Sequence, residues 1–182
     1  PRTGTFDELR WFEVEPAYSF HTFNAYEDGD EVILEACRMV PQSSEDLFTT
    51  SEIPQPWRWS LNMANGAMRE TQIDDRFTDF PMIDLRLQGQ EHRYNYGLSL
   101  THMSEDYPMH PKGIFKYDRR EGVMEEWSLE EAVQPDEALF IPASANAGED
   151  EGWLLSVIYN RATDKSELVI LDAQSVTAGP IA

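Results

Sequence analysis

FHTFNAYEDGDEVILEACR, residues 20–38, is the stretch that decides the fold of this 182-residue chain. Its second half, EVILEACR, is rich in β-branched and aliphatic residues, and the run EDGD before it is a turn signal. The stretch therefore predicts strand structure on both sides of a turn. His21 lies between Phe20 and Thr22 in a strand that should otherwise bury apolar groups. A histidine at such a position needs an explanation of its own.

Apolar and polar residues continue to alternate along most of the chain. WRWSLNMA (57–64) places both of its tryptophans on one face, and an Asn-Gly pair follows as a hairpin signal. Further strands are predicted at 9–15, 82–88, 92–100, 113–118, 137–143, 152–160 and 166–173. Short strands at this spacing predict an all-β fold of antiparallel strands, as a sandwich, barrel or propeller. The one helix candidate is SLEEAV (128–133), whose serine would be the N-cap.

The net charge, the cysteine count and the lengths of the apolar runs limit which partners and which setting this protein can have. The net charge of −20 argues against nucleic acid and against basic docking on an anionic membrane, although an apolar membrane contact stays open. The single cysteine, Cys37, excludes an intrachain disulfide framework. No apolar run approaches the roughly 18 residues that span a bilayer. The first ten residues, PRTGTFDELR, lack both a signal-peptide pattern and an initiating Met. A cytoplasmic protein that begins further upstream is expected.

Familiar catalytic motifs are missing from the sequence. It contains no phosphate loop, GxSxG, HExxH or CxxC, and its 34 carboxylates are too many for an acid/base pair to be chosen among them. Four histidines remain as chemistry-bearing residues. His92, His102 and His110 are expected at surface or loosely packed positions and do not predict a local metal cluster.

Five segments, in order, resemble the motifs of one family. They are FHTFNAYEDGDEVILEACR (20–38), TDFPMIDLRLQGQEHRYNYGLSL (78–100), GIFKYDRREG (113–122), EALFIPASANAGEDEGWLLSVIYN (137–160) and SELVILDAQSV (166–176). Together they resemble the carotenoid cleavage oxygenases, which include carotenoid and apocarotenoid dioxygenases, lignostilbene dioxygenases and the retinoid isomerase of the visual cycle. Each motif is weak alone, whereas five in register over most of the chain are specific.

The resemblance implies a seven-bladed β-propeller in which four histidines from separate blades hold one Fe(II). His21 would be the third of these histidines in chain order. The first two would lie upstream of Pro1, and the fourth would follow the end of the sequence given. Residues 1–182 would therefore be the C-terminal part of a single propeller domain, about three blades, without its N-terminal part and last strand.

The resemblance also assigns residues around the iron. Neutral imidazoles suit Fe(II), and carboxylates that accept the other ring N–H fix the orientation of each ligand. Two family glutamates with this role map onto Glu149 and onto Asp79, where a shorter aspartate makes a direct bond to imidazole uncertain and favours a bridging water or a shifted strand. Phe20 and Phe80 would face the substrate tunnel, where flat apolar rings suit a polyene or a stilbene.

Two classes of function stay open at this point. The first is an Fe(II)-dependent non-haem dioxygenase that cleaves a C=C bond of a carotenoid, apocarotenoid or stilbene with O2 to give two carbonyl products. The second is a non-catalytic propeller fragment that binds a partner or has a structural role. The partners expected are the apolar substrate, O2 and the remainder of the protein's own propeller. Histidines outside residues 1–182 would discriminate between the two classes.

Overall fold

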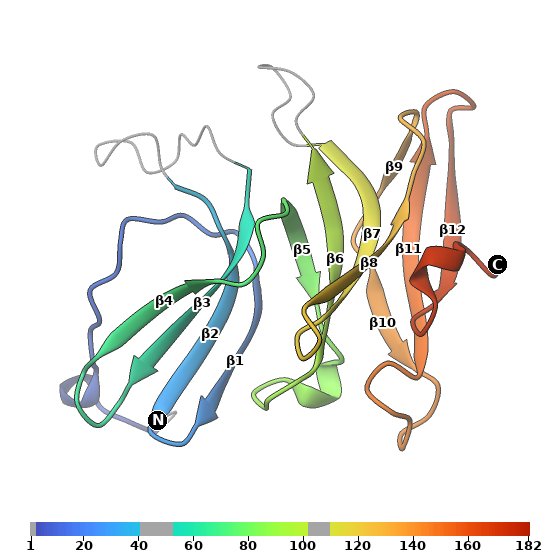
Figure 1. Cartoon of the computed structure of the whole chain (residues 1–182). Coiled ribbons are helices and arrows are strands. Elements are labelled where there is room, and N and C mark those ends of the chain that lie inside the picture. The colour runs from blue at the N-terminus through green and yellow to red at the C-terminus, as the bar shows by residue number, and fades with distance from the viewer. Residues whose placement is uncertain (1–2, 41–52, 102–109) are drawn as a thin grey trace.

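The computed structural model describes residues 3–40, 53–101 and 110–182, and within them the chain consists of strands and three short 3₁₀ turns (Figure 1). The strands are β1 (Thr22–Asp28), β2 (Glu31–Arg38), β3 (Gln55–Asn62), β4 (Met68–Gln72), β5 (Thr78–Met82), β6 (Tyr94–Thr101), β7 (His110–Asp118), β8 (Val123–Ser128), β9 (Val133–Pro135), β10 (Leu139–Pro142), β11 (Gly152–Asn160) and β12 (Lys165–Asp172). The 3₁₀ turns are η1 (Phe6–Glu8), η2 (Leu85–Leu87) and η3 (Val176–Ala178). The all-β prediction is confirmed.

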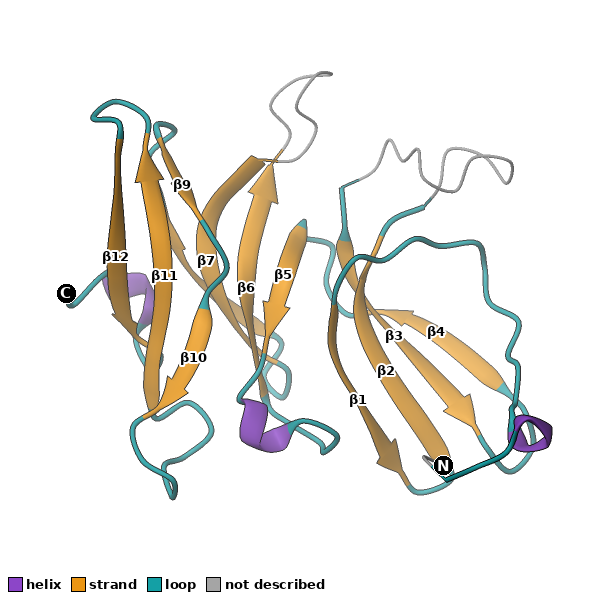
Figure 2. Cartoon of the chain, turned by 180° about the vertical axis from the view of Figure 1, so that it is seen from behind, coloured by secondary structure: helices purple, strands orange, loops and turns teal. Residues whose placement is uncertain are grey.

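These strands form three consecutive four-stranded antiparallel sheets, which stand side by side (Figures 1 and 2). The first sheet has the order β1-β2-β3-β4 and the second the order β5-β6-β7-β8. The third has the order β10-β11-β12, and β9 pairs with the far end of β11. Residues 180–182 continue along β12, where the Ile181 N–H donates to the carbonyl of Ile170 (2.7 Å). Three sheets in chain order agree with the expectation of about three blades.

The deciding stretch folds as the β1–β2 hairpin. Glu27 pairs with Val32 and Asp28 with Glu31, so the predicted turn closes the two strands directly. Gly29 has φ +59° in this turn, a conformation that glycine adopts without steric cost. β11 and β12 likewise match the predicted strands at 152–160 and 166–173.

Three predicted elements differ from the structure. Residues 9–15 do not join a sheet: Trp11 is 87% exposed, and the segment is tied to the first sheet by a bond from the Glu15 N–H to Glu70 Oε1 (3.1 Å). The strand predicted at 82–88 is not formed. The observed strand β5 ends at Met82, and η2 follows it. The helix predicted at 128–133 is absent, because Leu129 donates its N–H to the Lys112 carbonyl (2.8 Å) and extends the sheet.

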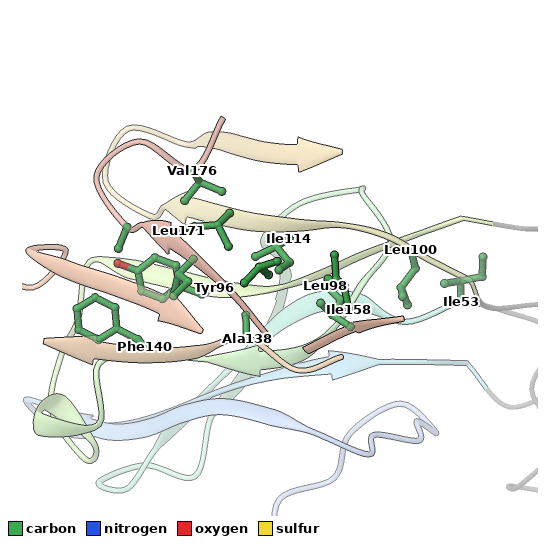
Figure 3. Packing of buried hydrophobic residues seen from close by; sticks show 13 residues of the cluster. Ile53, Tyr96, Leu98, Leu100, Ile114, Ala138, Phe140, Ile158, Leu171 and Val176 are labelled. Atoms are coloured by element: carbon green, nitrogen blue, oxygen red, sulfur yellow. The ribbon is translucent and has the colours of Figure 1, made fainter. Parts of the chain in front are cut away.

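The main apolar core lies between the second and third sheets (Figure 3). Tyr96 and Phe140 stack there with ring centroids 5.3 Å apart and planes 5° from parallel. Around them pack buried aliphatic side chains from both sheets and from η3, namely Leu98, Leu100, Ile114, Leu154, Ile158, Val169, Leu171 and Val176. This core fixes the second sheet, on which half of the candidate site is built.

The contact between the first and second sheets combines a small apolar cluster, formed by Phe23, Cys37, Phe115 and Tyr117, with a buried polar network. Glu35, on β2, is fully buried, and its Oε1 lies 2.6 Å from Arg58 Nη2 and 2.5 Å from Arg119 Nη2. His92 is also buried: its Nε2–H donates to Asn95 Oδ1 (2.6 Å), and the ring lies near the Glu35 carboxylate. We call Glu35, Arg58, Arg119 and His92 the Glu35 network. It adds charged contacts to this small apolar cluster, whereas the second and third sheets share the larger apolar core.

The outer face of the third sheet carries large apolar side chains that are exposed in this chain. The strand registers place five of them on one face, namely Leu139, Trp153, Val157, Tyr159 and Leu168. An uncovered apolar sheet face is what a blade presents to a neighbouring blade. Within the described part of the chain, no helix combines the length and the apolar character needed to cross a bilayer.

Candidate functional site

His21 stands immediately before β1, and its backbone is fixed from two sides. Its carbonyl accepts the N–H of Cys37 on β2 (3.0 Å) and the hydroxyl of Ser19 (3.1 Å). The imidazole is not enclosed, since 38% of its side chain is exposed. The histidine that interrupts the apolar pattern is therefore held by its main chain and open on one side of its ring.

Asp79, on β5, holds the imidazole directly. Its Oδ1 lies 2.9 Å from Nδ1 of His21, and its carboxylate is almost fully buried. An ionised carboxylate only accepts hydrogen bonds, so Nδ1 carries the proton and Nε2 keeps its lone pair. Of the two expected arrangements, a bridging water or a shifted strand, the bridging water is not needed, because β5 brings the Asp79 carboxylate within direct reach of the ring.

Two aromatic rings flank the imidazole. The Phe80 ring centroid lies 4.8 Å from that of His21 with planes 34° apart, and the Phe20 centroid lies 6.1 Å away. Phe20 is 59% exposed and meets Tyr18 edge to face (4.7 Å). The structure thus gathers His21, Phe20 and Phe80 from two sheets, and their contact with substrate stays a prediction.

Cys37 is a member of this group that the sequence did not single out for the site. Its thiol is buried beside Asp79. Burial raises the pKa of the Cys37 thiol well above its ordinary value, and the neighbouring Asp79 carboxylate raises it further. The thiol is thus protonated next to the carboxylate that holds His21. Strand alternation was the signal in the sequence that could have indicated the burial of Cys37, because it points residues 35 and 37 to the same face of the strand.

Glu149 lies away from His21. It stands in the loop between β10 and β11, at the end of the sheets opposite to His21 (Figure 1). Its Oε1 accepts the backbone N–H groups of Arg93 (2.5 Å) and Tyr94 (2.7 Å), where β6 begins. In this placement the Glu149 carboxylate caps the start of β6 and does not contact His21, and its expected contact with a ligand histidine outside residues 1–182 stays a prediction.

The loop that carries Glu149 is held in place by an arginine. Arg86, in η2, donates to the carbonyls of Ser144, Ala145, Ala147 and Gly148 at 3.1–3.2 Å. Asp84 in turn pairs with the same guanidinium (2.5 Å). Arg86 therefore fixes this loop to η2.

The other histidines are not at the site either. His92 belongs to the Glu35 network, and His110 is buried beside Arg161, with Nδ1 3.3 Å from Nη2. Both were expected at surface or loosely packed positions, and neither lies at the surface, because each is buried with a polar partner. Burial lowers the pKa of both imidazoles. His102 lies outside the described residues.

His21 fits the role of one ligand of a metal ion and no more. Among the described residues, no group of three or more His, Cys, Asp or Glu side chains is placed to hold an ion. A partly exposed imidazole with a carboxylate on Nδ1 is the arrangement typical of a metal-ligating histidine.

A cavity of about 560 Å³ lies away from His21. It opens between the first and second sheets at the end where Glu149 lies, and neither Phe20 nor Phe80 lines it. Its wall contains five arginines, namely Arg58, Arg69, Arg93, Arg119 and Arg120. Most of them are paired with acidic side chains, so the cavity has no clear excess of either charge.

Comparison with known proteins identifies a family and several relatives that the chain resembles. The family model described as "RPE65: Retinal pigment epithelial membrane protein" matches residues 1–182. The whole chain is 33% identical to isoeugenol monooxygenase of Pseudomonas putida, of which it covers 41%. It is 30% identical to apocarotenoid-15,15'-oxygenase of Synechocystis sp., of which it covers 38%.

A solved structure agrees with these matches. The crystal structure of cobalt-substituted Synechocystis ACO superposes on the whole chain with a TM-score of 0.84 and 29% identity, and the chain covers 39% of it. Residues 1–182 thus span about two-fifths of the length of the relatives that they match. Sequence, fold and relatives agree with the five motifs, and the chain belongs to the RPE65 family of carotenoid cleavage oxygenases.

Proposed function

We propose that residues 1–182 are part of an Fe(II)-dependent non-haem dioxygenase that cleaves a C=C bond with O2 and gives two carbonyl products. The observation that carries this proposal is the His21–Asp79 pair, with Nε2 available and two aromatic rings alongside. Both oxygen atoms enter the products, so R–CH=CH–R′ and O2 give R–CHO and R′–CHO without a further reductant.

Each residue of the pair has a defined task in this proposal. Iron, when bound, supplies the activation of O2. His21 contributes one neutral nitrogen donor, which leaves the charge of the ion largely uncompensated. Asp79 keeps the proton on Nδ1 and makes Nε2 a better donor. By the family resemblance, the other three histidine ligands belong to the same protein outside residues 1–182.

The substrate class follows from the apolar surroundings of His21. Phe20 and Phe80 offer flat ring surfaces to a flat conjugated molecule, and such surfaces suit both a polyene and an aryl alkene. The relatives are named for isoeugenol and for apocarotenoids, which represent these two kinds of alkene. A carotenoid, apocarotenoid or stilbene is therefore the proposed substrate.

The setting of the enzyme is proposed from the surface. The apolar outer face of the third sheet supports packing against the rest of the propeller. The net charge of −20 disfavours nucleic acid as a partner, and a peripheral apolar contact with a membrane would bring an apolar substrate to the protein. We also propose that the protein is cytoplasmic.

One observation favours the alternative of a non-catalytic propeller fragment. His21 is the one histidine among the described residues that combines an exposed ring with an outer carboxylate, and one ligand does not retain iron. Under this alternative the complete protein lacks the other three histidines and has only a binding or structural role.

Metal analysis of the complete protein tests the proposal. The wild type should contain one Fe(II), His21→Ala should contain none, and His110→Ala should retain it, because the buried His110 has its own arginine partner. Undiminished iron in His21→Ala would refute the ligand role. A wild type without iron would favour the non-catalytic alternative.

A further inference from the structure

The strand that carries Asp79 is interrupted at the site. In the pairing of β5 with β6, Asp79 lies opposite Leu98 and Met82 opposite Tyr96. Three steps along β5 therefore match two steps along β6, so β5 contains one extra residue, a β-bulge. Phe80 stands in this bulge with φ +52°, the left-handed region that a bulky residue rarely adopts.

The bulge turns two consecutive side chains toward one target. In a regular strand, Asp79 and Phe80 would point to opposite faces of the sheet. Here Asp79 Oδ1 bonds Nδ1 of His21 at 2.9 Å, and the Phe80 ring lies against the face of the same imidazole, 4.8 Å between centroids. One contact fixes the edge of the ring and the other fixes its plane. Together they leave the imidazole little freedom about χ1 and χ2.

The surrounding chain accommodates the interruption. A Cβ on Gly97, in β6 opposite the bulge, would lie 3.0 Å from the Asp79 carbonyl oxygen and 2.9 Å from Phe115 Cε1, so only glycine fits without displacement. Pro81 follows Phe80 and has no N–H, so at Pro81 the break in the ladder leaves no donor without a partner. Strained backbone of this kind persists where its surroundings over-determine it, commonly at functional sites.

We propose that Phe80 is a positioning residue: its left-handed backbone and its ring together set the direction of the His21 Nε2 lone pair. This inference rests on the proposed function, since it concerns a metal bound at Nε2. It gives Phe80 a task beyond the substrate contact expected from the sequence. Phe20, whose ring is further from the imidazole and largely exposed, has no part in this task.

Loss of metal from the complete protein tests the proposal independently of turnover. The protein is loaded with Co(II), an excess of EDTA is added, and the visible absorption of the bound cobalt is followed with time. Phe80→Leu keeps an apolar side chain but removes the ring, and we expect it to lose cobalt about tenfold faster, the lower end of the usual effect of a residue that orients a ligand. Phe20→Leu, the matched control, should change KM but keep the wild-type rate of cobalt loss.

Two more variants separate positioning from stability. Phe80→Tyr keeps the ring and should restore the wild-type rate. Phe80→Asn tolerates the left-handed backbone, so the metal-free protein should keep its thermal stability and yet lose cobalt as fast as Phe80→Leu. If Phe80→Leu does not fold, the rate of cobalt loss from Phe80→Asn decides whether Phe80 positions His21.

The failures of the two proposals are distinguishable. Wild-type rates of cobalt loss in both Phe80→Leu and Phe80→Asn would overturn the positioning role while leaving His21 as a ligand. A wild type that binds no cobalt would overturn the proposed function and the inference with it.

Discussion

Replacing Glu35 by glutamine should loosen the contact between the first two sheets. Glutamine keeps the shape of the side chain but removes the charge that Arg58 and Arg119 share. Arg119 is only 8% exposed, and its other partners, the Tyr26 hydroxyl (2.9 Å) and the His92 carbonyl, are neutral. Removing one member of a buried ion pair costs about 3–5 kcal/mol. Arg58 is 35% exposed and can recover water, so we expect the lower figure, about 3 kcal/mol.

Hydrogen exchange of the β2 amides in the complete protein measures this loss locally. A change of about 3 kcal/mol corresponds to roughly a hundredfold faster exchange through opening of the strand, at about 1.4 kcal/mol for each tenfold change. Glu31→Gln on the same strand is the control, because its pair with Arg69 is exposed and 3.7 Å long and is worth less than about 1 kcal/mol.

A second substitution tests the cause of the loss. Adding Arg119→Met to Glu35→Gln removes the unpaired buried charge, so exchange of β2 should slow again toward the wild-type rate. Unchanged exchange in Glu35→Gln, or an effect no larger than that of Glu31→Gln, would refute the argument that the Glu35 network holds the two sheets together.

Further outcomes follow from the site and the surface. Burial, and next the nearby Arg119, lowers the pKa of His92 from 6.5, so below that pH the unfolded chain binds a proton that the folded chain does not. The urea midpoint of the complete protein should therefore fall as the pH drops from about 7 to about 5, and His92→Gln should flatten this fall; parallel profiles would contradict it. Asp79→Ala should weaken metal binding about 10- to 100-fold in competition with a chelator, and equal affinity would show that the His21–Asp79 bond is dispensable. Residues 1–182 alone should elute as a self-associated species in size-exclusion chromatography, because the outer face of the third sheet is apolar; a stable monomer that retains iron would contradict both this and the single-ligand argument.

The strands that the sequence predicted well are those with a strong two-residue period. GWLLSVIYN alternates between buried and more exposed residues along its length, SELVILD does so over its last four residues, and β11 and β12 follow within one residue of the prediction. The edge strands β4 and β8 were missed, because MRETQ and VMEEWS are mostly polar and present no buried face to the pattern. Alternation reports burial of one face, and an edge strand can form with little of it.

Two segments have local sequence patterns that predict a strand or a helix, but neither forms the predicted element. LRWFEVE (9–15) alternates like the true strands, yet it lies outside the sheets with Trp11 exposed. SLEEAV (128–133) carries a helix cap signal, yet its first residues continue the edge of the second sheet. In both cases the backbone groups took the hydrogen-bond partners that the fold provided, and no local signal announces these.

The candidate site divides in the same way. The sequence by itself determined the family, the all-β architecture and the choice of His21, because motifs in register identify residues without any knowledge of distance. Only the tertiary structure decided that Asp79 reaches the imidazole and that Glu149 does not. The first depends on a left-handed residue at Phe80, which phenylalanine does not favour, and the second on a loop that Arg86 holds at the far end of the sheet. Both are set by contacts between residues distant in sequence, and these contacts exist only once the sheets have packed.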